Sequence, residues 1–109
     1  MAKCERRTLA LTASAATTGE IIDYDEFVGG RVHLPTGSTI TSLTFHDSYD
    51  DGTTFSAAWD DAATPAAVTR TVAADRSYPI PDAMFSAERI RIVADAAEDV
   101  EVVLKKYAI

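Results

Sequence analysis

The sequence predicts an all-β protein, folded as an antiparallel β-sandwich or as a jelly-roll-like barrel of about eight short strands. Two observations predict this class. Short runs rich in Val, Ile and Thr recur along the whole chain, and Gly, Pro, Asp and Ser separate them. No segment keeps a helical spacing of apolar residues for three turns. The chain has 109 residues, 47% of them hydrophobic but only 8% aromatic, so we expect one domain with a thin core.

The expected elements follow in chain order. We predict strands over residues 6–13, 20–24, 30–34, 39–46, 53–59, 67–73, 89–94 and 100–107. One short helical turn is expected near 81–86, because Pro81 suits a first helical position and Met84 and Phe85 could then close one end of the sheets. Residues 1–19 form an N-terminal arm or a first strand with a flexible stretch, and residues 20–109 form a single β-sandwich domain.

The last two strands alternate clearly between core and outer face. Ile90, Ile92 and Ala94 share the core face of the first of them. Val100, Val102 and Leu104 share the core face of the second. The opposite face of the final strand carries Glu101, Val103, Lys105, Tyr107 and Ile109. An apolar chain end on a solvent face is unusual, so either another segment of the chain or a neighbouring subunit covers it.

Charge limits the classes of partner. The net charge is −7, which argues against nucleic-acid binding through phosphate contacts. Basic residues gather at both chain ends, where they are either solvated surface or a contact edge for an acidic neighbour or a second copy. We predict a partner interface there, made of Arg6, Arg7, Val103, Lys105, Lys106, Tyr107 and Ile109.

Catalytic and cofactor motifs are not found. Cys4 is the single cysteine, so no intramolecular disulfide can form. The alternation of side chains along their predicted strands places His33 and His46 on outer faces. No glycine-rich phosphate loop, nucleophile elbow or zinc-binding pair is found in the sequence. We therefore expect no enzymatic activity, no cofactor and no metal ion. No stretch resembles a signal-peptide core or a membrane span, so neither secretion nor membrane insertion is expected.

The stretch "HDSYDDGTTF" is the strongest candidate for a metal site. If Asp47 opened an EF-hand loop, Asp51 and Gly52 would fall at its fifth and sixth positions. Tyr49 would then stand at the third position, and Ala58 at the twelfth, where a bidentate glutamate is needed. An EF-hand is therefore rejected, and a calcium site improvised from these acids remains a minor alternative.

A hairpin is the preferred interpretation of the same stretch. A three-residue loop at 50–52 would pair Phe45 with Ala57 and Leu43 with Trp59, which brings both apolar sets to one side. A two-residue loop would turn those sets to opposite faces. The three-residue register places Trp59 in the core.

From Gly29 onward the features follow in this order: a "LPTGSTITSLTF" strand, the acidic hairpin, the "WDD" loop, a "TVAA" strand, a "YPIPDAMF" turn and a final pair of strands ending in "VVLKK". In this order of features the chain resembles small virion proteins of tailed bacteriophages and prophages. The resemblance implies a non-enzymatic β-sandwich of the virion, assembled in the host cytoplasm. It most specifically implies a head decoration or cement protein, with neck or tail positions as alternatives.

The same resemblance implies the partners. They would be the major capsid protein or neighbouring virion subunits, together with further copies of the chain as a homo-oligomer. The first 27 residues match nothing in the resemblance, and a capsid-binding arm would be sought there. A glycan- or ligand-binding module is the rival hypothesis, with Tyr49, Trp59 or Tyr78 as a stacking platform and calcium at the acidic loops.

Overall fold

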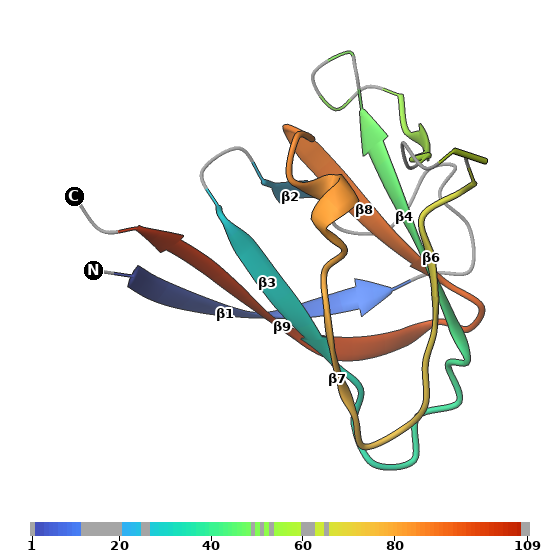
Figure 1. Ribbon diagram of the computed structural model, residues 1–109. Coiled ribbons are helices and arrows are strands. Elements are labelled where there is room, and N and C mark those ends of the chain that lie inside the picture. The colour runs from blue at the N-terminus through green and yellow to red at the C-terminus, as the bar shows by residue number, and fades with distance from the viewer. Residues whose placement is uncertain are drawn as a thin grey trace.

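The protein is a sandwich of two antiparallel β-sheets (Figure 1). The computed structural model describes residues 2–11, 21–24, 27–48, 50, 52, 54–59, 63, 64 and 66–107. Within these residues the chain forms nine strands and one turn of 3-10 helix. The predicted all-β sandwich is therefore confirmed.

The first sheet has the order β1-β9-β3-β7. Its strands are β1 (Ala2–Leu11), β9 (Glu98–Tyr107), β3 (Gly29–His33) and β7 (Ser77–Pro79). The two longest strands pair along their whole length, from Ala2 opposite Tyr107 to Leu11 opposite Glu98. The last strand of the chain thus lies between the first strand and the third.

The second sheet has the order β2-β8-β4-β5, with β6 also on β4. Its strands are β2 (Ile22–Asp23), β8 (Arg89–Ala94), β4 (Ser42–Ser48), β5 (Ser56–Ala57) and β6 (Thr69–Thr71). β5 pairs with the end of β4 and β6 with its beginning, so the two form one interrupted edge strand. At the interruption Trp59 bridges to Ala67.

The core lies between the sheets and follows the alternation of each strand. β1 contributes Leu9 and Leu11, and β4 contributes Leu43 and Phe45. The β8 and β9 residues that parity assigned to the core are all buried: Ile90, Ile92, Ala94, Val100, Val102 and Leu104. Gly30 is needed in β3, because a Cβ there would lie 2.7 Å from the Val103 carbonyl oxygen.

The helical turn closes one end of the sandwich. The 3-10 helix covers Asp82–Met84 and follows Pro81, within the predicted region. Met84 is fully buried, as expected of a residue that closes the sheets. Phe85 is instead 62% exposed, because it follows the turn and points away from the core.

The predicted register of the acidic hairpin is wrong. His46 pairs with Ala57 and Asp47 with Ser56, so Phe45 does not face Ala57. Phe55 therefore lies on the outer face of the second sheet, where its ring covers the Arg91 guanidinium at 4.3 Å. Trp59 is 65% exposed instead of buried. Residue 51 of the predicted loop, and the flanking residues 49 and 53, lie outside the described residues.

Candidate functional site

Strand alternation divides the predicted interface between two faces. Arg6, Val103 and Lys105 lie on the outer face of the first sheet. Arg7 and Lys106 lie on the inner face, because each is the sequence neighbour of an outward residue. Tyr107 ends β9, and Ile109 lies outside the described residues. The structure thus brings together only part of the predicted set.

Two of these outward residues, Arg6 and Val103, belong to a row of neighbouring side chains that crosses β1, β9 and β3. Val103 lies between its partners Arg6 of β1 and Arg31 of β3. In the next row Glu101 lies opposite His33. These residues line a hollow of about 280 Å³, whose walls are Arg6, Arg31, His33, Ser77, Glu101 and Val103. Its charged lining consists of the guanidinium groups of Arg6 and Arg31 and the carboxylate of Glu101, and Val103 is its aliphatic residue.

Hydrogen bonds orient the two guanidinium groups of this hollow. Arg31 donates from Nε to Ser77 Oγ at 2.9 Å and from Nη2 to the Ser77 carbonyl oxygen at 3.0 Å. Arg6 Nη2 lies 3.4 Å from Glu101 Oε2. Such an exposed ion pair contributes little to stability, so Arg6 remains available to a partner.

We call this surface the basic face and define it by Arg6, Arg31 and Lys105 around Val103. Its three cations and the Glu101 carboxylate give 3 − 1 = +2, while the whole chain carries −7. The remainder of the chain therefore carries −9. Sequence reasoning missed Arg31, which lies far from both chain ends, although strand parity places Arg31 and His33 on the same face.

The inward cations hold a different part of the molecule. The guanidinium carbon of Arg7 lies 5.6 Å from the centre of the Phe27 ring, and Lys106 Nζ lies 5.8 Å from it. Arg7 also pairs with Glu5 at 2.6 Å. Phe27 is 3% exposed and contacts the Tyr24 ring. Arg7 and Lys106 thus attach the segment before β3 to the middle of β1 and to the end of β9.

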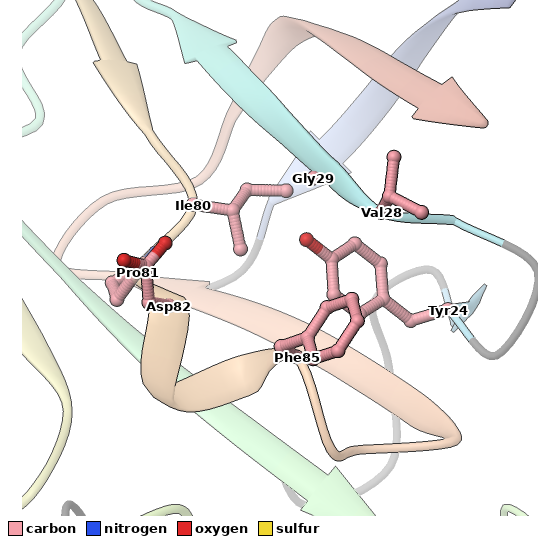
Figure 2. Close-up of a pocket in the computed structure, with 7 residues that line it drawn as sticks. All are labelled: Tyr24, Val28, Gly29, Ile80, Pro81, Asp82 and Phe85. Carbon is pink, nitrogen blue, oxygen red and sulfur yellow. The ribbon is translucent and has the colours of Figure 1, made fainter. Parts of the chain in front are cut away.

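A second hollow, of about 220 Å³, lies beside the 3-10 helix. Figure 2 shows its lining, with the Tyr24 hydroxyl directed toward Ile80 and the Phe85 ring beside Tyr24. Burial, followed by the negative charge of Asp82, raises the pKa of Tyr24. Tyr24 therefore stays protonated and can donate a hydrogen bond. Val28 and Phe85 are exposed apolar residues at this hollow.

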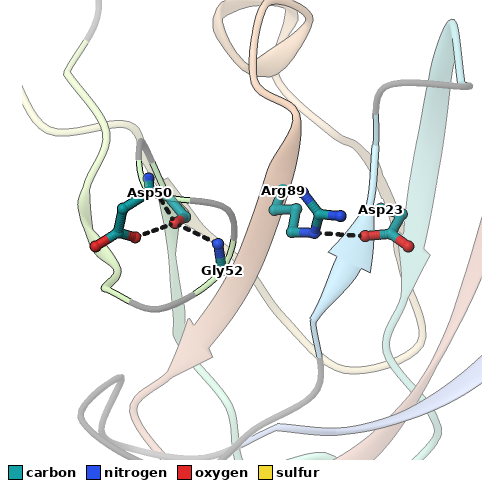
Figure 3. A network of polar contacts seen from close by, with 5 residues as sticks. Asp23, Asp50, Gly52 and Arg89 are labelled. Atoms are coloured by element: carbon teal, nitrogen blue, oxygen red, sulfur yellow. Dashed lines mark hydrogen bonds and ion pairs between the residues drawn. The ribbon is translucent and has the colours of Figure 1, made fainter.

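The acidic hairpin forms a capped turn. Ser48 Oγ accepts hydrogen bonds from the Gly52 N–H at 2.8 Å and the Asp50 N–H at 3.3 Å, and it donates to Asp50 Oδ1 (Figure 3). The Thr54 N–H donates to the same carboxylate at 2.7 Å. Bonds from Thr54 and then Ser48 lower the pKa of Asp50. This carboxylate is thus an acceptor that shapes the turn.

A second set of carboxylates consists of Asp75 on the turn between β6 and β7, Asp95 directly after β8, and Glu98 and Asp99 at the start of β9. We call these four residues the acidic end. Threonines of the connection between β3 and β4 hold three of them. Thr36 donates to Asp75 at 2.5 Å, Thr39 donates twice to Glu98 at 2.8 Å, and Thr41 donates to Asp95.

These threonine bonds also set the charge of the acidic end. Bonds from the Thr41 hydroxyl and then its N–H lower the pKa of Asp95. Bonds from the Thr39 N–H and then its hydroxyl lower the pKa of Glu98. Both carboxylates therefore stay ionised in mildly acidic solution.

The outer face of the second sheet buries a polar cluster. Arg91 is 8% exposed and lies opposite His46, as its strand partner. Burial first, and then the Arg91 charge, lower the pKa of His46, while Asp47 acts in the opposite direction. His46 is therefore neutral at pH 7. The alternation of side chains along the strand predicted that His46 points outward. The sequence did not show that Phe55 would cover the neighbouring Arg91 on that face.

Across the described residues, no three side chains of the His, Cys, Asp or Glu types lie close enough together to share a metal ion. None of the described helices is long and apolar enough to cross a membrane.

Comparison with known proteins identifies a similar fold. No protein-family model and no curated protein matches the sequence. Among solved structures, the chain is similar to the SPBc2 prophage-derived protein YomS, with a TM-score of 0.62 and 11% sequence identity. The likeness covers 97% of this chain and 96% of YomS. Nearly the whole chain, from first strand to last, therefore shares the fold of a prophage-derived protein.

Proposed function

We propose that this chain is a non-enzymatic structural protein of a bacteriophage or prophage particle. The observation that carries the proposal is its likeness to YomS, a prophage-derived protein, over almost the full length of both chains. The sequence resemblance to phage virion proteins from Gly29 onward supports the same assignment. The described carboxylates at the hairpin and the acidic end accept structural hydrogen bonds, which is consistent with a role without catalysis.

More narrowly, we propose a head decoration or cement protein that binds the major capsid protein and stabilises the shell. Small virion subunits of this kind act by burying surface against their neighbours, and specific interfaces bury on the order of 1,000 Å² or more. The exposed basic face offers one such surface, since it combines the aliphatic side chain of Val103 with oriented guanidinium groups. A position in the neck or tail would use the same properties.

Capsid binding tests the narrower proposal. The purified chain is mixed with expanded capsids of the source phage, and bound protein is measured after sedimentation of the capsids. We expect saturation at a fixed number of copies per capsid and a higher capsid melting temperature, because a ligand of the assembled state stabilises it. An unrelated acidic β-protein serves as the control. No binding to expanded capsids would contradict the decoration role, and binding to isolated tails would replace it with a tail role.

A ligand-binding module is the second candidate, and the exposure of Trp59 favours it. The indole is 65% exposed beside the interrupted edge strand, where a sugar ring or another planar ligand could stack. Tyr78 is less suitable, because it is partly buried and its hydroxyl accepts a bond from the Ala73 N–H. Tyr49 lies outside the described residues. A saturable change in Trp59 fluorescence on addition of host-cell glycans would support this function.

A further inference from the structure

The charges of the first sheet are arranged along the direction of β9. Glu98 and Asp99 begin the strand, and Lys105 lies seven residues later, about 23 Å away at the rise of a β-strand. β1 runs antiparallel, and Arg6 lies opposite Val103, two residues from Lys105 and five residues from Glu98. Figure 1 shows the beginning of β1 and the end of β9 at one side of the sandwich and the start of β9 at the other. The sheet therefore has a basic half and an acidic half.

We propose that the basic face of one copy binds the acidic end of a second copy, in a head-to-tail contact. The basic face consists of Arg6, Arg31 and Lys105 around Val103, with a net charge of +2. The acidic end carries four carboxylates, and Arg76 next to Asp75 reduces its charge from −4 to −3. The proposal deepens the proposed function and rests on it, since a virion subunit acts in many neighbouring copies.

The hollow of the basic face suits carboxylate side chains. Its volume of about 280 Å³ lies just below the range of about 300–1,000 Å³ for sites that enclose small ligands, so it has room for one or two acidic side chains. Ser77 fixes the direction of Arg31, which lowers the entropic cost of binding a carboxylate. Val103 supplies apolar contact between the two guanidinium groups.

The acidic end is suited to enter such a hollow. Its carboxylates stand on turns and at a strand start, and Asp75, Asp95 and Asp99 are exposed. Each ionised carboxylate offers about four acceptor sites, so threonine bonding leaves capacity for a guanidinium. The threonine bonds also fix the positions of Asp75, Asp95 and Glu98 before a partner arrives.

The symmetry of the contact follows from its two unlike surfaces. One copy contributes a sheet face and the other contributes an end of the sandwich, so the contact is heterologous. Heterologous contacts propagate from copy to copy and form rings when the rotation closes, or open arrays when it does not. A two-fold dimer would instead bury the same residues on both copies.

Sedimentation velocity of the purified full chain tests the contact. We expect species larger than a monomer at about 0.01 M salt, and their dissociation at about 1 M salt, where charges are screened beyond about 3 Å. A chain that stays monomeric at low salt up to about millimolar concentration would overturn the proposal.

Matched variants locate the contact. Arg6→Gln with Arg31→Gln gives a net charge of −7 − 2 = −9 and should weaken self-association at least about fivefold. The control is Thr69→Glu with Thr71→Glu, on exposed positions of β6, which gives the same −9 and should leave the contact unchanged at moderate salt. Equal weakening by the two pairs would mean general charge repulsion and would overturn the assigned surface. Thermal melting verifies that each variant is folded.

Mixing two defective variants tests the head-to-tail arrangement. The triple variant Asp75→Asn, Glu98→Gln and Asp99→Asn has an intact basic face, and Asn suits the left-handed backbone of Asp75. Mixed with the Arg6→Gln and Arg31→Gln variant, it should form one-to-one dimers that grow no further. Mixtures that remain monomeric, or that grow as the unaltered chain does, would overturn the arrangement.

The capsid experiment separates this inference from the proposed function. A chain that binds capsids but never associates with itself would overturn the head-to-tail contact and leave the proposed function standing. A chain that associates head to tail but binds neither capsids nor tails would retain the contact and contradict the virion role.

Discussion

At the scale of single residues, neighbours in the sequence have different tasks. Arg6 and Lys105 face outward, while Arg7 and Lys106 face inward toward Phe27. The alternation that assigns Val103 and Lys105 to one face also places Lys106 on the other, so this division could have been predicted from the sequence. The contact of the Phe27 ring with the two inward cations could not be predicted, because it depends on the path of the segment before β3.

We expect Phe27→Leu to lower the free energy of unfolding by about 1–2 kcal/mol. The change removes ring area from a buried site and the attraction of Arg7 and Lys106 for the ring face. Chemical denaturation measures the loss. Phe85→Leu is the matched control, since Phe85 is largely exposed and should lose only a few tenths of that amount. Equal losses at both positions would contradict the anchoring role of Phe27.

At the scale of elements, strands with strong alternation were predicted well. β8 and β9 place alternate aliphatic residues in the core, and their predicted bounds agree closely with the observed Arg89–Ala94 and Glu98–Tyr107. β7 was missed, because "SYP" contains a proline and only Tyr78 packs against the core. The hairpin register was wrong because it depends on Arg91, a residue of another strand, which Phe55 covers.

Hydrogen bonds from the connection between β3 and β4 make the free energy of unfolding decrease as the pH falls in the acid range. Asp95 and Glu98 have lowered pKa values in the folded protein, so unfolded chains bind more protons in acid. Their contribution to stability is complete above the unfolded-state pKa values. This contribution is lost progressively as the pH falls below about 5 and then through the pKa values that the two carboxylates have in the folded protein.

Removing threonine hydroxyls should reduce this acid dependence. In the double variant Thr39→Val and Thr41→Val, the carboxylates lose hydroxyl donors and retain the backbone donors. We expect a smaller difference in unfolding free energy between about pH 7 and about pH 3, measured by urea denaturation. Thr69→Val, on exposed β6, controls for the loss of a hydroxyl alone. An unchanged pH difference in the double variant would contradict the assigned cause.

At the scale of the whole molecule, the class of fold could be predicted from the sequence, but the order of the strands in each sheet could not. Turn residues and β-branched runs indicated a sandwich, yet they carry no information about which strands become neighbours. The position of β9 between β1 and β3 is set by contacts between residues that are 68 to 105 positions apart in the sequence. For the same reason the basic face could be predicted only in part, since Arg31 joins it through β9.

The pairing of the first strand with the last has a consequence for folding speed. Ala2 and Tyr107 are direct partners, so a short linker could join the chain ends, and new ends could be opened between Ala96 and Ala97. In that circular permutant β9 and β1 would be consecutive in the sequence. The strand pairing with the largest sequence separation would then become a local hairpin. Lower contact order speeds folding, so the permutant should refold faster than the original in stopped-flow experiments. Equal or slower refolding would show that closing this ladder does not limit the rate.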